Sequence, residues 1–200
     1  MSLSVANLSH EFSEGEPVFN EFSMHIEDGE LVALVGPSGC GKSTLLHCIV
    51  GLITPTSGLV HVDGNDVSNK KSHERGIGIM MQDQPLYEHL SVEQNIAFPL
   101  RSRGVKKPAV SNILEQLDLT DIAKQKVSTC SGGERRRIAF GRAIVTKPSV
   151  LLLDEPFVSL NEELRDTIRE NIVQSDIPIL LVSHNSEEAA ALSDRMIALE

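Results

Sequence analysis

The feature that most constrains this chain is a glycine-rich loop between an apolar run and a helix-forming segment. The loop reads Gly36-Pro37-Ser38-Gly39-Cys40-Gly41-Lys42-Ser43-Thr44. Glycines let the backbone curve closely, so that successive N–H groups point inward and form a nest for an anion. Lys42 adds a point charge beside that anion, and the Ser43 hydroxyl is a suitable ligand for Mg²⁺. The pattern G-x-x-x-x-G-K-[ST] therefore predicts a loop that binds nucleotide phosphates.

The segments on either side of the loop strengthen this prediction. Leu31–Val35 is a continuous apolar run, as expected of a buried parallel strand. Thr44–Val50 is expected to begin a helix, whose N-terminus would add a positive dipole end. A glycine-rich turn without a ligand is the alternative, and the order of strand, loop and helix disfavours it.

Composition excludes several classes of protein. The 200 residues suit one domain, or one core with a small subdomain. Lys plus Arg total 18 and Asp plus Glu total 28, giving a net charge of −10, so we expect no nucleic-acid partner. Cys40, Cys48 and Cys130 are odd in number and lack metal-site spacing, which suits free thiols in a reducing compartment. The chain contains no apolar run of transmembrane length and no signal-peptide pattern, so we expect a soluble cytoplasmic protein.

The pattern along the chain predicts an α/β fold. Residues 3–35 alternate as strands do, and Asp-Gly turns at 28–29 and 63–64 indicate a small antiparallel sheet. Further strands are expected at 77–81, 150–153, 179–183 and 196–199. Helices are expected over 92–126, interrupted by a Pro-bounded loop near Pro108, and over 133–146 and 187–192. Another helix is expected to carry a buried stripe at Leu160, Leu164, Ile168 and Ile172. This alternation predicts a mainly parallel sheet with right-handed crossovers.

Asp154 and Glu155 directly follow a buried strand. Ligands bind at the carboxyl ends of parallel strands, where these carboxylates would lie. Asp154 would hold Mg²⁺, through water, and Glu155 would polarise the attacking water. The alternative is an acidic loop that caps a helix, which the nearby phosphate-binding loop makes the weaker interpretation.

Gln82 and His184 also follow predicted strands. The Gln82 amide oxygen could reach Mg²⁺ or the attacking water. His184 could donate a hydrogen bond to the γ-phosphate and so sense the state of the nucleotide. The alternatives are that Gln82 is an ordinary loop residue and that His184 is a structural histidine. Both assignments therefore depend on the position of each residue after a predicted strand.

The segment Ser131-Gly132-Gly133-Glu134 has two compatible interpretations. The pattern S-x-x-E before a helix predicts a capping box, in which Ser131 caps the helix and Glu134 reaches back. Two glycines at a helix start also let a phosphate approach the bare N–H groups. Because the loop at Gly36 already serves its own chain, this segment would serve a nucleotide held by a second molecule.

Together these motifs resemble the ATP-binding cassette of ABC transporters, in the family's order and over nearly the whole chain. The resemblance assigns Gly36–Thr44 to Walker A, Met80–Asp83 to the Q-loop, Cys130–Glu134 to the signature motif, Val150–Pro156 to Walker B, Ser159–Asn161 to the D-loop and His184 to the switch histidine. Cys130, Glu134 and Asn161 replace the usual Leu, Gln and Asp. The resemblance implies a P-loop NTPase fold with a RecA-like core, a small antiparallel β subdomain and an inserted helical subdomain.

The resemblance also implies ligands and partners. ATP and Mg²⁺ would bind, with Phe12 stacking on adenine and Val18 supporting it. A head-to-tail dimer with a second copy, or with a related cassette, would place Ser131 and Gly133 of one chain on the ATP held by Lys42 of the other. Permease subunits in the membrane would hold the cassette at its inner face, contacting the loop at 87–90. Residues 1–83 and 139–200 would form the nucleotide-binding core and residues 84–138 the helical subdomain.

The segment Glu74–Gln82 resembles importer subunits, and an exporter-type acidic-glycine segment before the signature is absent. We therefore expect an ATPase that powers an importer, as a minimal cassette or as part of a longer chain. A non-transport ABC ATPase and a P-loop kinase are the alternatives. A kinase would not account for Ser131–Glu134, Gln82 and His184 together.

Overall fold

The computed structural model describes most of the chain, as two compact units. The described residues are 1–13, 15–83, 85–157, 165–166, 169–170, 172 and 176–199. The first unit comprises Met1–Ile79, Ser149–Glu155 and Ser175–Glu200, and the second comprises Met80–Pro148 and Pro156–Gln174. The first unit contains the antiparallel sheet and nearly all of the parallel sheet.

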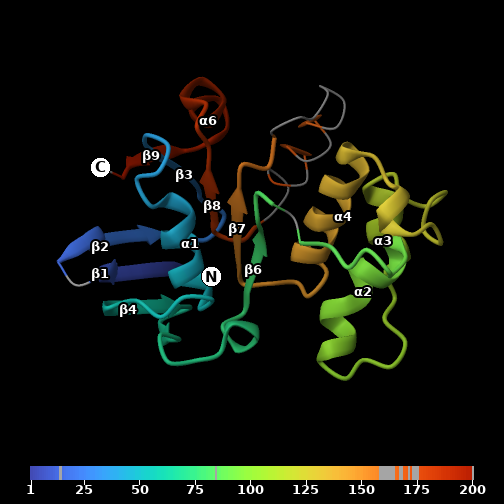
Figure 1. Ribbon diagram of the computed structural model, residues 1–200, viewed down its shortest axis with the longest axis horizontal. Coiled ribbons are helices and arrows are strands. Elements are labelled where there is room, and N and C mark those ends of the chain that lie inside the picture. The colour runs from blue at the N-terminus through green and yellow to red at the C-terminus, as the bar shows by residue number, and fades with distance from the viewer. Residues whose placement is uncertain are drawn as a thin grey trace. The chain divides into compact units, whose positions relative to one another are not determined.

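A four-stranded antiparallel sheet forms the N-terminal part of the first unit (Figure 1). Its strands are β1 (Leu3–Ser13), β2 (Glu16–Ile26), β4 (Ser57–Val62) and β5 (Asn65–Asp66), in the order β2-β1-β4-β5. The turn between β4 and β5 contains Asp63 and Gly64, as their sequence predicts. The expected small antiparallel sheet is therefore confirmed.

A bulge in β1 changes which alternate residues face the core. The pairing of β1 with β2 shifts register between Val5 and Leu8, and Asn7 between them has φ 49. Asn tolerates this left-handed conformation better than most residues. Val5 is buried before the bulge, whereas Leu8 and His10 are buried after it.

The second sheet has five strands and a parallel centre. Its strands are β3 (Leu31–Val35), β6 (Ile77–Met80), β7 (Val150–Asp154), β8 (Ile179–Val182) and β9 (Arg195–Ala198), in the order β6-β7-β8-β3-β9. β3 pairs in parallel with β8 and β9, and β7 pairs in parallel with β8. β7 and β8 are buried along their whole length, which explains why they read as continuous apolar runs. The expected mainly parallel sheet is confirmed.

Helix α1 (Lys42–Val50) packs between the two sheets (Figure 1). Leu45, Leu46 and Ile49 are fully buried in a cluster that includes residues of both sheets. The helix begins at Lys42 rather than at Thr44, because the N–H of Leu45 already donates to the Gly41 carbonyl at 2.8 Å. A second helix, α6 (Ser186–Leu192), is capped by the Asn185 side chain.

Arg75 lies well beyond α1 in the sequence, yet its side chain caps the C-terminal end of that helix. It follows a short 3₁₀ helix (Ser72–Glu74) and is only 5% exposed. Its guanidinium donates to the carbonyls of Cys48 and Ile49, at 3.0 and 2.8 Å, in the last turn of α1. It also donates to the carbonyls of Ser68 and Lys70, at 2.7 and 3.0 Å. Burial lowers the pKa of Arg75, and the neighbouring Cys48 and Asp66 oppose that shift.

The second unit contains the helices α2 (Val92–Ser102), α3 (Ser111–Gln116) and α4 (Gly132–Ile144), and residues 165–166, 169–170 and 172 are helical as well. Helix was expected over 92–126, apart from a loop near Pro108. This expectation was wrong beyond Gln116, where α3 ends. Asp118 has φ 51, and the N–H of Leu119 turns back to the Leu114 carbonyl at 2.7 Å, which ends the helix. Turns and bends follow up to Gln125, and Lys126 makes an isolated antiparallel bridge with Ser91.

The expected stripe at 160–172 falls largely outside the described residues. Leu160, Leu164 and Ile168 are not described, whereas Ile172 is described and is buried. Ser159–Asn161, assigned above to the D-loop, also lies outside the described residues.

Replacement of Arg75 should destabilise the first unit. Arg75→Met fills similar volume but removes the guanidinium donor from four backbone carbonyl groups, so we expect a loss of about 3 kcal/mol in the free energy of unfolding. Urea denaturation followed by circular dichroism measures this loss. Arg101→Met, at an exposed position, is the control and should change stability by less than about 0.5 kcal/mol. Equal midpoints for the two variants would show that the Arg75 cap contributes nothing.

Candidate functional site

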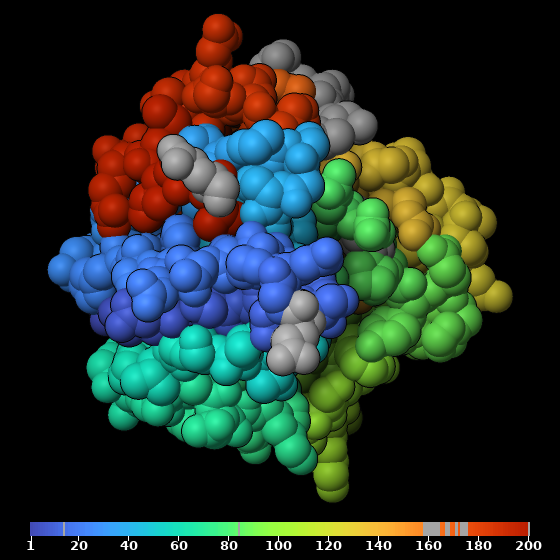
Figure 2. All heavy atoms as spheres, turned by 60° about the vertical axis from the view of Figure 1, so that its left-hand side comes forward, coloured from blue at the N-terminus to red at the C-terminus, as the bar shows by residue number. Residues whose placement is uncertain are grey.

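The glycine-rich loop connects β3 to α1, and close contacts explain two of its glycines. Gly41 has φ 98, and a Cβ there would lie 2.5 Å from Val18 Cγ1. A Cβ on Gly36 would lie 2.5 Å from the Leu199 carbonyl oxygen. Larger residues would push the loop away from β2 or from the end of β9. Figure 2 shows this part of the chain, in light blue, at the surface between the blue β1–β2 layer and the red C-terminal segment.

Lys42 is buried within the loop although it carries a charge. Only 8% of its surface is exposed, and its Nζ donates to the carbonyl oxygens of Gly36 and Pro37 at 2.7 and 2.8 Å. The loop therefore holds a positive charge against its own backbone. Among the described residues no side chain caps the N-terminus of α1. The N–H groups of its first turn are thus available to an anion.

The other predicted loop residues surround this charge. Pro37, Ser38 and Gly39 form the exposed tip, and Ser43 and Thr44 are half-buried in the first turn of α1. The Cys40 Sγ lies 3.8 Å from the Lys42 Nζ. The arrangement is that of a concave, positively charged loop at a helix start, which suits a polyphosphate.

The parallel sheet brings the predicted acidic residues to the edge from which the loop leaves. Val182 pairs with Leu34 of β3 on one side and with Asp154 of β7 on the other. The carboxyl ends of β3, β7 and β8 therefore lie at one edge. The loop begins there at Gly36, and Glu155 follows β7 there.

Glu155 contacts His184 at this edge. Glu155 Oε2 lies 2.8 Å from His184 Nδ1, and the N–H of Glu155 donates to the Val182 carbonyl at 3.0 Å. Glu155 is 8% exposed, whereas the His184 side chain is 63% exposed. Glu155 also has φ 51, a left-handed conformation that costs on the order of 1 kcal/mol in a residue other than glycine. A carboxylate held this way can accept a proton from a water molecule, and the imidazole fixes its orientation.

Phe12 and Val18 lie in the first unit as well. Phe12, near the end of β1, is 69% exposed, so its ring is available for stacking. Val18 in β2 is half-buried and contacts the core around Gly41. The first unit thus contains the loop, Phe12, Val18, Asp154, Glu155 and His184.

Gln82 and the signature residues lie in the second unit. Gln82 is exposed in the turn after β6. Ser131 Oγ accepts from the N–H of Glu134 at 3.3 Å, and Glu134 Oε2 accepts from the N–H of Ser131 at 2.6 Å. The predicted capping box at the start of α4 is therefore present, with Gly132 and Gly133 as the first helical residues.

The chemistry of the donor set fits Mg²⁺ better than a tightly bound transition metal. Among the described residues no group of three His, Cys, Asp or Glu side chains could hold a metal ion. Mg²⁺ uses few protein oxygens and keeps water and phosphate ligands. The Ser43 hydroxyl at the start of α1 and the buried Asp154 carboxylate at the end of β7 are oxygens of that kind.

Three residues that shape these units were not expected from the sequence. His10 packs beside Phe12, Arg75 caps α1, and Asn95 binds the loop before α2. A signal existed for His10 alone, since it alternates with Leu8 on the buried face of β1. Arg75 and Asn95 bind backbone carbonyl groups. Every residue has such a group, so no sequence pattern indicates which of them the fold brings close.

Comparison with known proteins identifies the family of this chain. Together the fold and the loop define a P-loop nucleotide triphosphatase. The sequence profile of the ABC transporter family matches residues 19–158, and the chain belongs to that family.

The chain is 39% identical over 206 residues to the sn-glycerol-3-phosphate import ATP-binding protein of Psychromonas ingrahamii, covering 99% of this chain and 55% of the relative. It is 38% identical over 211 residues to a sulfate/thiosulfate import ATP-binding protein of Agrobacterium fabrum, covering 100% and 61%. The chain thus spans less than two thirds of the length of these relatives.

Solved structures of cassettes share the fold. A dimeric ATP-binding cassette in a post-hydrolysis state, bound to ADP and Pi, matches with a TM-score of 0.87 and 25% identity, covering 99% of this chain and 94% of that one. A bacterial Atm1-family ABC exporter with ATP bound matches with a TM-score of 0.86 and 25% identity, covering 100% and 37%. Import and export proteins are thus both among the matches. Within the described part of this chain no helix has the length and apolar character needed to cross a membrane.

The Ser131 cap can be separated from any role in ligand binding. Ser131→Ala removes the acceptor for the Glu134 N–H and should cost about 1 kcal/mol of stability. Ser131→Asp keeps an acceptor at the N-cap and should change stability by less than about 0.5 kcal/mol. Urea denaturation of both variants checks this. An equal loss in both would mean that the side-chain bond is not what stabilises α4.

Proposed function

We propose that the chain is the ATP-binding and ATP-hydrolysing subunit of an ABC transporter, and that this transporter is an importer. The observation that carries the proposal is the placement of the Glu155–His184 pair at the sheet edge from which the Lys42 loop leaves. The names of the two curated relatives support import, since both are import ATP-binding proteins.

The substrate would bind along the first unit. Phe12 stacks on the adenine, and Val18 supports it from β2. The nest of loop N–H groups and the Lys42 ammonium bind the phosphates. Ser43 and Asp154 would hold Mg²⁺, and the ion would neutralise charge on the phosphates.

Hydrolysis would use the Glu155 carboxylate as the general base. Glu155 accepts a proton from water as the water oxygen forms a bond to the γ-phosphorus, and the bond to the ADP oxygen breaks. The products are ADP and phosphate. His184 keeps Glu155 in position and donates to the γ-phosphate when its ring turns toward it.

The second unit would complete the site of another copy. Ser131, Gly132, Gly133 and Glu134 stand at the N-terminus of α4, where backbone N–H groups can bind a γ-phosphate. A head-to-tail dimer, with a second copy or a related cassette, would bring them there. The dimeric cassette that shares this fold supports such an assembly.

Permease subunits would bind the loop Tyr87–Leu90, within a helical subdomain at residues 84–138. Asn95 is fully buried and presets this loop, accepting from the Tyr87 N–H at 2.8 Å and donating to the Tyr87 carbonyl at 3.0 Å. Arg135 donates to both Glu88 carboxylate oxygens, at 2.5 and 3.1 Å, and these bonds hold the pKa of Glu88 below its usual value. A loop fixed in this way loses little entropy on docking.

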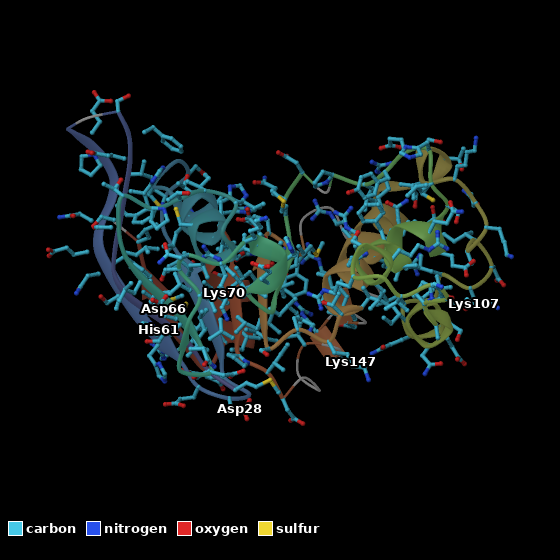
Figure 3. All side chains as sticks on the ribbon, turned by 90° about the horizontal axis from the view of Figure 1, so that it is seen from below. Asp28, His61, Asp66, Lys70, Lys107 and Lys147 are labelled. Atoms are coloured by element: carbon cyan, nitrogen blue, oxygen red, sulfur yellow. The ribbon has the colours of Figure 1, made fainter. Side chains whose placement is uncertain are left out.

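Loss of the loop charge should abolish turnover. Lys42→Ala removes the ammonium that contacts the β- and γ-phosphates, so we expect ATPase activity to fall by about 10² or more. Phosphate release measures it. Lys107→Ala is the matched control, because Lys107 is exposed on the second unit (Figure 3) and should leave turnover unchanged. Unchanged turnover in Lys42→Ala would sink the assignment of the phosphate site.

Glu155→Gln should bind ATP and trap a dimer. The amide cannot accept the proton from water, so hydrolysis stops while ATP still bridges the two chains. Size-exclusion chromatography with and without ATP should show a dimer only with ATP. Adding Ser131→Asp to this variant keeps the α4 cap but repels the γ-phosphate, and should return the protein to a monomer. A dimer that forms without ATP, or one that persists after Ser131→Asp is added, would contradict the composite site.

A further inference from the structure

His10 is a buried polar residue with an unusual environment. It is only 8% exposed, and neither ring nitrogen has a hydrogen-bond partner among the described residues. Leaving a buried polar group without a hydrogen bond destabilises the fold. Its place in the first unit therefore needs an explanation other than hydrogen bonding.

The ring contacts of His10 supply one. Its ring lies 4.7 Å from that of Phe12, centroid to centroid, at 88°, the edge-to-face arrangement that aromatic pairs favour. On β2, Phe19 pairs with His10 across the strands, and their ring centroids are 6.3 Å apart. His10 thus stands between an exposed ring and a buried one.

The buried ring leads on to the phosphate-binding loop. Phe19 is 4% exposed, and its Cδ1 would lie 3.6 Å from a Cβ on Gly41. The Cγ1 of the neighbouring Val18 would lie 2.5 Å from the same atom. The rings of Phe12, His10 and Phe19 therefore form a series within the first unit, and Phe19 lies close to the loop at Gly41.

We propose that His10 is a positioning residue that holds Phe12 in the orientation needed to stack on the nucleotide base, at a spacing fixed by Phe19 and the phosphate-binding loop. This inference rests on the proposed binding of ATP with its adenine on Phe12. A side chain as exposed as Phe12 loses conformational entropy when a ligand immobilises it, and this loss weakens binding. Contact with the buried His10 ring already orders Phe12 before ATP binds. Less entropy is then lost when the base stacks on the Phe12 ring.

The test compares ligands with and without a base. Isothermal titration calorimetry measures the Kd of MgATP and of magnesium tripolyphosphate for the wild type, His10→Leu, His10→Phe and Phe12→Ala. Leu fills the buried volume without a ring, whereas Phe restores the edge-to-face contact. We expect His10→Leu to weaken MgATP binding about fivefold and to leave tripolyphosphate binding within about twofold. His10→Phe should bind both ligands as the wild type does.

Each other outcome overturns the inference. Equal weakening of both ligands by His10→Leu would show that His10 only supports the fold, and no weakening of either would show that it has no role. In a Phe12→Ala background, His10→Leu should cause no further loss of MgATP affinity, and a further loss would mean that His10 acts by another route. Failure of the underlying function looks different. Wild-type protein would then bind no MgATP, or Phe12→Ala would weaken both ligands alike.

Discussion

The parallel register of β7, β8 and β3 is the constraint on which the rest of the first unit depends. Val182 is paired with Asp154 on one side and Leu34 on the other, so the three strands end together. One residue of slip in β7 would exchange Asp154 with its neighbours and turn its side chain to the other face of the sheet. The Glu155–His184 contact and the start of the Lys42 loop both follow from this pairing.

The proposed function divides its chemistry between the two units. The first unit carries the groups that bind and cleave a nucleotide, and the second carries a helix start that is already stable without one. Because Ser131 and Glu134 satisfy each other, α4 does not depend on a ligand for its cap. A ligand is therefore not needed to form the surface that would bind it. In the proposed dimer, association would then depend on ATP although the cap of α4 is formed without it.

Sequence reasoning succeeded where function requires a short contiguous pattern. The loop at 36–44, the strand before it and the capping box at Ser131 all follow from local rules, and the fold class follows from the order of strands and helices. It was wrong over 117–126, where Asp118 adopts a left-handed conformation that the apolar spacing of Leu114 and Leu117 conceals. The roles of His10 and Arg75 could not be predicted, because each depends on partners brought close only by the fold. His10 also needs the bulge at Asn7, which changes the alternation of β1.

The carbonyl cap that Arg75 places on α1 has an electrostatic consequence for the whole helix. An α-helix of nine residues is about 14 Å long and carries roughly half a positive charge at its N-terminus and half a negative charge at its C-terminus. Arg75 fixes a cation at the negative end and, being buried, is poorly screened by salt. A phosphate bound at the other end would complete a row of alternating charges along one axis. Arg75 would then add a small attraction to whatever affinity the loop has for an anion, from the opposite end of the helix.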